Sequence, residues 1–133
     1  MNYNYLVMKI LSQQDFPLLE DYSKIFKITP TTIFAYNNII YSNDNNLSKD
    51  LIIHEETHFK QQEKYGLEQW VFNYLYNQHL RLDYEVEAYT NQINSIKDRN
   101  QKYITLITSA KILSSNLYGN IINYEQALKK LCR

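Results

Sequence analysis

Glycine and proline, the two residues that most often interrupt regular structure, each occur only twice in this chain of 133 residues. From about Leu47 to the C-terminus, apolar residues recur with the period of an α-helix. Gly66 and Gly119 both fall where this pattern breaks, as expected for residues that follow the last turn of a helix. The sequence therefore predicts a mainly helical body for most of the chain.

The helical pattern divides into several segments. The first runs from about Leu47 to Tyr65, and the second carries an amphipathic stripe from Leu67 to Gln78. A third helix is expected from about Asp83 to Asp98. Its inward face is predicted to carry Val86, Tyr89, Ile93 and Ile96. Two more helices are predicted around residues 102–114 and 124–131.

The N-terminal part has a different pattern. Residues 31–42, TTIFAYNNIIYS, are rich in β-branched and aromatic residues, and they are predicted to form a hairpin that turns at Asn37-Asn38. Before them, YLVMKIL is compatible with a short strand and FPLLEDYSKIF with a helix that begins at Pro17. The predicted fold class is α+β, with a small N-terminal β element followed by a mainly helical body. The length fits one domain over residues 1–133.

Composition limits the classes of function. A content of 44% hydrophobic and 21% charged residues is typical of a folded globular domain. The formal net charge is zero, which argues against binding to nucleic acid, although residues 97–133 are mildly basic. No apolar run is long enough to cross a membrane and no signal peptide is evident, so a cytoplasmic location is expected. The single cysteine, Cys132, cannot form an internal disulfide, and nothing indicates an oligomeric state.

The segment HEETH, residues 54–58, carries the strongest chemical signal in the chain. Residues i and i+4 lie on one face of a helix, so the imidazoles of His54 and His58 can reach a single metal ion. Glu55 lies about 100° further around the helix, where its carboxylate can accept a proton from a water molecule beside the metal. The alternative is that both histidines are core residues, each with a hydrogen-bond partner. A metal would serve both imidazoles at once, which favours the metal site.

A catalytic zinc site needs a third protein ligand. The remaining histidine, His79, lies 21 residues after His58 and fits no tight ligand spacing, and Cys132 is close to the terminus. The segment RLDYEVEAYTNQ offers the carboxylates of Glu85 and Glu87, which point about 200° apart on a helix. Glu85 lies at the edge of the apolar stripe, so periodicity favours it, with Glu87 as the alternative.

These two motifs, HEETH and EVEAY, resemble those of the gluzincin type of zinc metallopeptidase, in particular small zincin-like domains of phages and bacteria. The resemblance covers about residues 31–96. It implies zinc held by His54, His58 and Glu85, with Glu55 as general base. It also implies that the strand before the first helix lines a substrate cleft. Larger members of that family often carry an Asp that supports a ligand histidine where this chain has Tyr89, so the support must come from elsewhere. Gln61 and Gln62 follow HEETH; either one of them bonds to the site or both belong to an ordinary polar surface.

The sequence thus favours a zinc-dependent hydrolase, a metallopeptidase that cleaves a peptide or another amide in a peptide or protein substrate. The alternative is a zincin-like module with little or no activity and a structural or partner-binding role, for example in a phage particle or a secretion assembly. Retention of Glu55 favours the enzyme, because a purely structural zinc site has no use for a general base.

Overall fold

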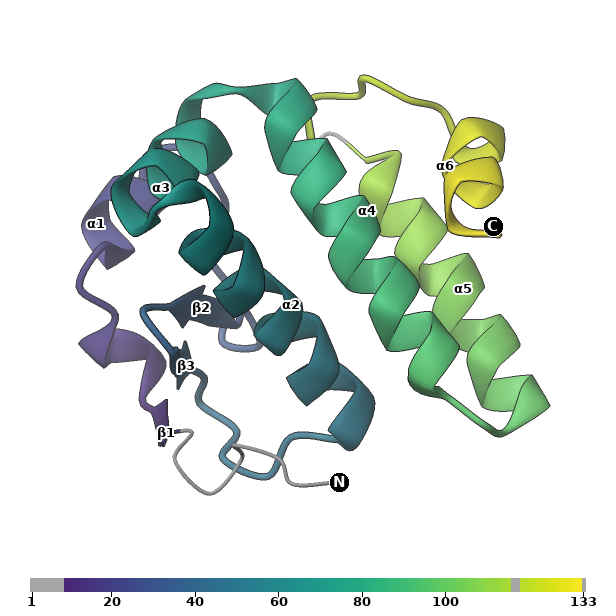
Figure 1. Cartoon of the computed structure of the whole chain (residues 1–133), viewed down its shortest axis with the longest axis horizontal. Coiled ribbons are helices and arrows are strands. Elements are labelled where there is room, and N and C mark those ends of the chain that lie inside the picture. The colour runs from purple at the N-terminus through teal and green to yellow at the C-terminus, as the bar shows by residue number, and fades with distance from the viewer. Residues whose placement is uncertain (1–8, 116–117, 133) are drawn as a thin grey trace.

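The computed structural model describes residues 9–115 and 118–132 (Figure 1). Its N-terminal part contains a strand, a short 3₁₀ turn, a short helix and a hairpin, followed by five longer helices. In chain order the elements are β1 (Lys9–Leu11), η2 (Gln13–Asp15), α1 (Leu19–Ser23), β2 (Phe34–Tyr36), β3 (Ile39–Tyr41), α2 (Lys49–Tyr65), α3 (Leu67–Tyr76), α4 (Gln78–Ser95), α5 (Arg99–Leu113) and α6 (Tyr124–Leu131). The predicted α+β class is confirmed. None of the described helices is long and apolar enough to cross a membrane.

The hairpin predicted within residues 31–42 is present as β2 and β3. Asn37 and Asn38 have φ angles of 53° and 65°, and two consecutive left-handed residues form the type of turn that matches the twist of the flanking strands. β1 pairs in parallel with β3, so the strand order is β1-β3-β2 and β2 forms one edge of the sheet. Only Lys9–Leu11 of the predicted YLVMKIL strand lies in the described part of the chain.

Several helix boundaries differ from the predicted ones by a few residues, among them the starts of two helices. The helix predicted from Pro17 begins at Leu19, and the helix predicted from Asp83 begins at Gln78. The second difference arises at Asn77, whose side chain accepts a hydrogen bond from the backbone N–H of Leu80 and so starts a new helix immediately after α3 ends. Gly66, with a φ of 90°, separates α2 from α3 as expected.

Most of the buried apolar residues in the described part of the chain form two clusters. One joins the sheet, α1 and α3 through Phe16, Tyr22, Phe34, Tyr41 and Leu75. The other joins α4, α5, α6 and the loop before α6 through Leu82, Ile93, Ala110, Leu113, Tyr118, Ala127 and Leu131. In Figure 1, α2 crosses between the sheet and the pair formed by α4 and α5.

The helix α2 buries only polar side chains. Its six buried residues are His54, Glu55, Thr57, His58, Gln61 and Gln62, and it contributes nothing to either apolar cluster. Burial of polar groups costs free energy unless each one finds a partner. The partners of these side chains therefore define the candidate site.

Candidate metal centre

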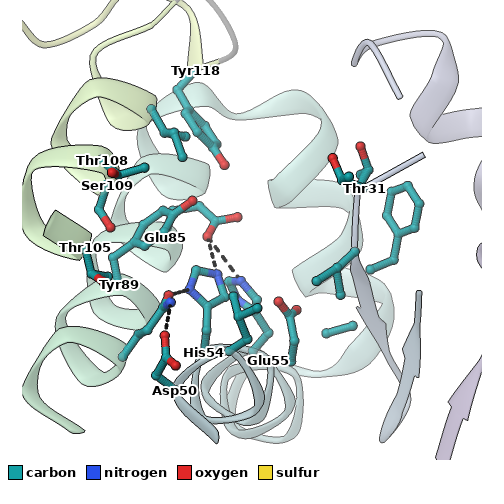
Figure 2. Close-up of a pocket in the computed structure, with 18 of the residues that line it drawn as sticks. Thr31, Asp50, His54, Glu55, Glu85, Tyr89, Thr105, Thr108, Ser109 and Tyr118 are labelled. Carbon is teal, nitrogen blue, oxygen red and sulfur yellow. Dashed lines mark hydrogen bonds and ion pairs between the residues drawn. The ribbon is translucent and has the colours of Figure 1, made fainter. Parts of the chain in front are cut away.

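The two histidines of HEETH meet a carboxylate from α4. His54 Nε2 lies 3.1 Å and His58 Nε2 lies 3.2 Å from the same atom, Glu85 Oε1 (Figure 2). One ligand atom from each of the three residues can be chosen so that all lie within 4.8 Å of one another, and all three side chains are buried. The structure therefore brings together the three residues predicted as metal ligands, and this group could hold a metal ion.

A glutamine fixes the orientation of the first imidazole. Gln92 Nε2 donates to Asp50 Oδ2 over 2.8 Å, so its Oε1 is the atom that faces His54 Nδ1, at 2.9 Å. An amide oxygen only accepts hydrogen bonds, so Nδ1 of His54 must carry a proton. In the neutral imidazole the Nε2 atom then has a free lone pair, and this lone pair faces Glu85.

A second glutamine, Gln61, fixes the orientation of the His58 imidazole. Gln61 Nε2 donates to the backbone oxygen of Tyr84 and to Glu87 Oε1, and Trp70 Nε1 donates to Gln61 Oε1. This network leaves Gln61 Oε1 as the acceptor of a hydrogen bond from His58 Nδ1, at 2.9 Å. The support expected for the two histidines thus comes from Gln92 and Gln61.

The consequence is that three acceptor atoms converge in a buried space. When both imidazoles are neutral, their Nε2 atoms and Glu85 Oε1 carry lone pairs that face each other, while the Tyr74 hydroxyl donates to the other carboxylate oxygen of Glu85. Such an arrangement is unfavourable without a cation between the acceptors. A single proton can bridge only one of the two contacts, whereas one metal ion satisfies all three atoms.

His58 and Glu85 form an ion pair when His58 is protonated. Burial alone would lower the pKa of His58, but the Glu85 carboxylate, with smaller contributions from Glu55 and Gln61, raises it to about 9. Burial alone would raise the pKa of Glu85, but the two histidines hold it well below its usual range. The proton on His58 therefore occupies part of the space that a metal ion would take.

Metal affinity is accordingly expected to depend on pH. Because a metal ion must displace the proton of His58, the zinc affinity should rise about tenfold per pH unit as the pH increases toward the His58 pKa of about 9, and then level off. Competition titrations against a chromophoric chelator at a series of pH values measure this slope. A zinc affinity that stays constant as the pH falls from about 9 to neutrality contradicts the arrangement.

Removal of the Gln92 side chain is expected to weaken metal binding without abolishing it. Gln92→Ala leaves His54 Nδ1 without its acceptor and frees the ring, which typically costs about 10–100-fold in metal affinity. The same chelator competition measures the change. Gln69→Ala, on the exposed surface of α3, is the matched control and should leave the affinity unchanged. Equal affinities of the two variants would exclude a role for Gln92 in orienting His54.

Glu55, the predicted general base, has no partner in the described part of the chain. Its side chain is 5% exposed, and no hydrogen bond or ion pair from a described residue reaches its carboxylate. Burial raises its pKa, and this effect exceeds the opposing influence of His54 and His58. An unpartnered buried carboxylate is costly, so it is expected where a water molecule or a substrate provides the missing contacts.

A cavity of about 740 Å³ opens above these residues and has the size of a site for a small ligand or a peptide segment. His54, His58, Glu55 and Glu85 all line it. Figure 2 shows its two walls, with Thr31 and the strand that follows on one side and Thr105, Thr108 and Ser109 of α5 on the other. Tyr89 packs its ring edge-on against His54, with 4.5 Å between ring centroids, and also faces the cavity.

The sheet presents its edge strand to this cavity. Residues 31–35 line the cavity, and β2 has no neighbouring strand on that side among the described residues. Gln62 occupies one end of the strand edge, because its Nε2 donates to the Ala35 oxygen over 2.8 Å and its Oε1 accepts from the Asn37 N–H over 3.1 Å. The part of the edge before Ala35 therefore remains open toward the cavity.

Other sequence candidates lie away from the centre. His79 and Cys132 are exposed and outside the cavity lining, and Glu87, the alternative third ligand, binds Gln61 instead of the histidines. Sequence reasoning missed the roles of Gln92 and Tyr74. Gln92 lies seven residues after Glu85 on the same helix face, so the periodicity that selected Glu85 also pointed to it. The contact of Tyr74 depends on the packing of α3 against α4, for which the sequence has no local signal.

Comparisons with protein-family models, with curated proteins and with solved structures find no significant match to this chain. The assignment of a function therefore depends on the motif and on the geometry of the centre.

Proposed function

We propose that this protein is a zinc-dependent hydrolase of zincin-like type, a metallopeptidase that cleaves a peptide or another amide bond. The observation that carries the proposal is the convergence of three buried acceptor atoms, from His54, His58 and Glu85, beside the unpartnered carboxylate of Glu55. Two imidazole nitrogens and one carboxylate oxygen are the protein ligands of catalytic zinc sites that leave a position open for water or substrate.

Different residues of the chain would have different roles in hydrolysis. A zinc ion held by His54, His58 and Glu85 would polarise the substrate carbonyl and lower the pKa of a nearby water molecule. Glu55 would accept a proton from that water as its oxygen attacks the carbonyl carbon. The carbon–nitrogen bond then breaks, and Glu55 passes the proton to the leaving nitrogen. Burial raises the pKa of Glu55, which makes its carboxylate a better proton acceptor.

The open edge of β2 supports a peptide as the substrate. An extended peptide can pair its backbone with a free strand edge, in the way that many domains bind peptides. The edge from residue 33 to Ala35 lines the cavity that holds Glu55, so a paired peptide would pass over the candidate centre. Gln62 would stop this pairing at Ala35, because it already occupies the Ala35 oxygen.

Hydrolysis of a defined peptide mixture by the zinc-loaded protein tests the proposal. The expected result is cleavage that stops when zinc is removed by a chelator and returns when zinc is restored. A zinc-loaded protein that cleaves no peptide or amide bond contradicts the enzymatic proposal and leaves the zincin-like module with a binding or structural role.

A further inference from the structure

The wall of the cavity formed by α5 is polar but carries no charge. Gln101, Thr105, Thr108 and Ser109 line the cavity from this helix, together with two isoleucines, Ile104 and Ile112. The charged groups among the described lining residues, apart from the histidines, are Lys27, Asp50, Glu55 and Glu85, all from other elements. The proposed hydrolysis makes no use of the hydroxyl groups on this wall.

Ser109 is the residue of this wall that most needs a partner. Its side chain is 2% exposed, and its hydroxyl makes no hydrogen bond with any described residue. Serine in a helix commonly bonds back to a carbonyl of the preceding turn, as Ser114 does with the oxygen of Ala110 over 2.9 Å. A buried hydroxyl without a partner is unfavourable, so its position on the cavity wall indicates a polar group of a ligand.

We propose that Thr105, Thr108 and Ser109 form a subsite for a neutral polar group of the substrate, the amide or hydroxyl of a side chain next to the bond that is cleaved. This inference deepens the proposed function and rests on it. Figure 2 shows the three residues side by side on α5, across the cavity from Thr31. Thr108 and Ser109 follow Thr105 by three and four residues, so all three lie on one side of the helix.

The chemistry of the wall selects a neutral group. A hydroxyl both donates and accepts a hydrogen bond, which matches the donors and the acceptor of an amide. A carboxylate or an ammonium group placed on this wall would lose its water without gaining an opposite charge from α5, which costs free energy. An apolar side chain would leave the Ser109 hydroxyl unpaired. The opposite wall offers Phe26, Ile33 and Phe34, which suit an apolar neighbour in the same substrate.

The test uses ligands that need bound metal but no turnover. Hydroxamates of N-acetylated asparagine, leucine, aspartate and lysine share a metal-chelating group, and the first three have side chains of similar shape. Their affinities for the zinc-loaded protein are measured by calorimetry. The asparagine compound is expected to bind about tenfold more tightly than the other three, and Ser109→Ala should remove most of this preference. Alanine is well tolerated in helices, and Ser114→Ala is the matched control that should retain the preference.

The outcomes of these measurements separate the subsite from the proposed function. Tightest binding of the leucine, aspartate or lysine compound, a preference unchanged by Ser109→Ala, or no binding of any hydroxamate overturns the subsite. A preference for asparagine in a protein that hydrolyses no amide leaves the subsite in place and removes the proposed function. Amide hydrolysis by a protein without a preference for asparagine overturns the subsite and leaves the proposed function in place.

Discussion

Replacing Glu55 by glutamine is expected to reduce the rate of amide hydrolysis by about 10²–10⁴-fold while zinc stays bound, which is the usual contribution of a positioned general base. Glutamine has nearly the same shape as glutamate but cannot accept the proton of the attacking water. The Glu55 side chain makes no hydrogen bond or ion pair with a described residue that the substitution would break, so the fold and the metal ligands should be preserved. A neutral side chain at this buried position should even be more favourable for folding.

Turnover of a cleaved peptide and zinc content, measured on the same preparation, check this prediction. Glu63→Gln is the matched control, because Glu63 lies on the same helix but is exposed to solvent. The control should keep both full activity and full zinc content. Equal activity in Glu55→Gln and the wild type would exclude Glu55 as the base, and loss of zinc in Glu55→Gln would show a structural role instead.

Replacing Glu85 by glutamine is expected to weaken zinc binding more than any change outside the ligand set. The substitution removes the only negative charge among the three ligand atoms and leaves His54 and His58 with a neutral partner. Loss of a group that merely supports a ligand costs about 10–100-fold in metal affinity, so the loss of a charged ligand should exceed about 100-fold. The Tyr74 hydroxyl can still donate to the glutamine oxygen, which favours retention of the fold.

Glu87→Gln separates the two carboxylates that the sequence offers as third ligand. Glu87 lies two residues further along α4 and accepts a hydrogen bond from Gln61 over 2.7 Å, so it reaches His58 only through that glutamine. Chelator competition should therefore find a modest loss of zinc affinity in Glu87→Gln and a large one in Glu85→Gln. The opposite order of the two losses would make Glu87 the ligand.

Local patterns in the sequence were sufficient for most of the fold. The Asn37-Asn38 turn could be predicted because few other residue pairs adopt consecutive left-handed conformations, and Gly66 marks the end of α2 for the same reason. The boundary at Asn77 was missed because the apolar pattern continues across it, while the helix start depends on one side-chain hydrogen bond. The pairing of β1 with β3 joins distant segments and has no local signature.

Some residues of the candidate centre could likewise be predicted from local patterns, and others could not. His54, Glu55 and His58 follow from spacing on one helix, and Glu85 follows from its position on the inward edge of another. Gln61 was considered as a support for the site, but its network with Trp70 and Glu87 depends on three helices meeting at one point. The open edge of β2 and the wall of α5 both depend on how distant elements pack, so the cavity itself could not be predicted.

The claim that His54, His58 and Glu85 hold zinc is tested by the zinc content of the purified wild-type protein and of Glu85→Gln, determined by elemental mass spectrometry. We expect one zinc ion per chain in the wild type and a large loss in the variant. A wild-type protein that retains no zinc after zinc is supplied and free metal is removed would contradict the claim. In that case His58 and Glu85 would form a buried ion pair beside His54, with no catalytic centre. Iron bound in place of zinc would retain the site and change the metal.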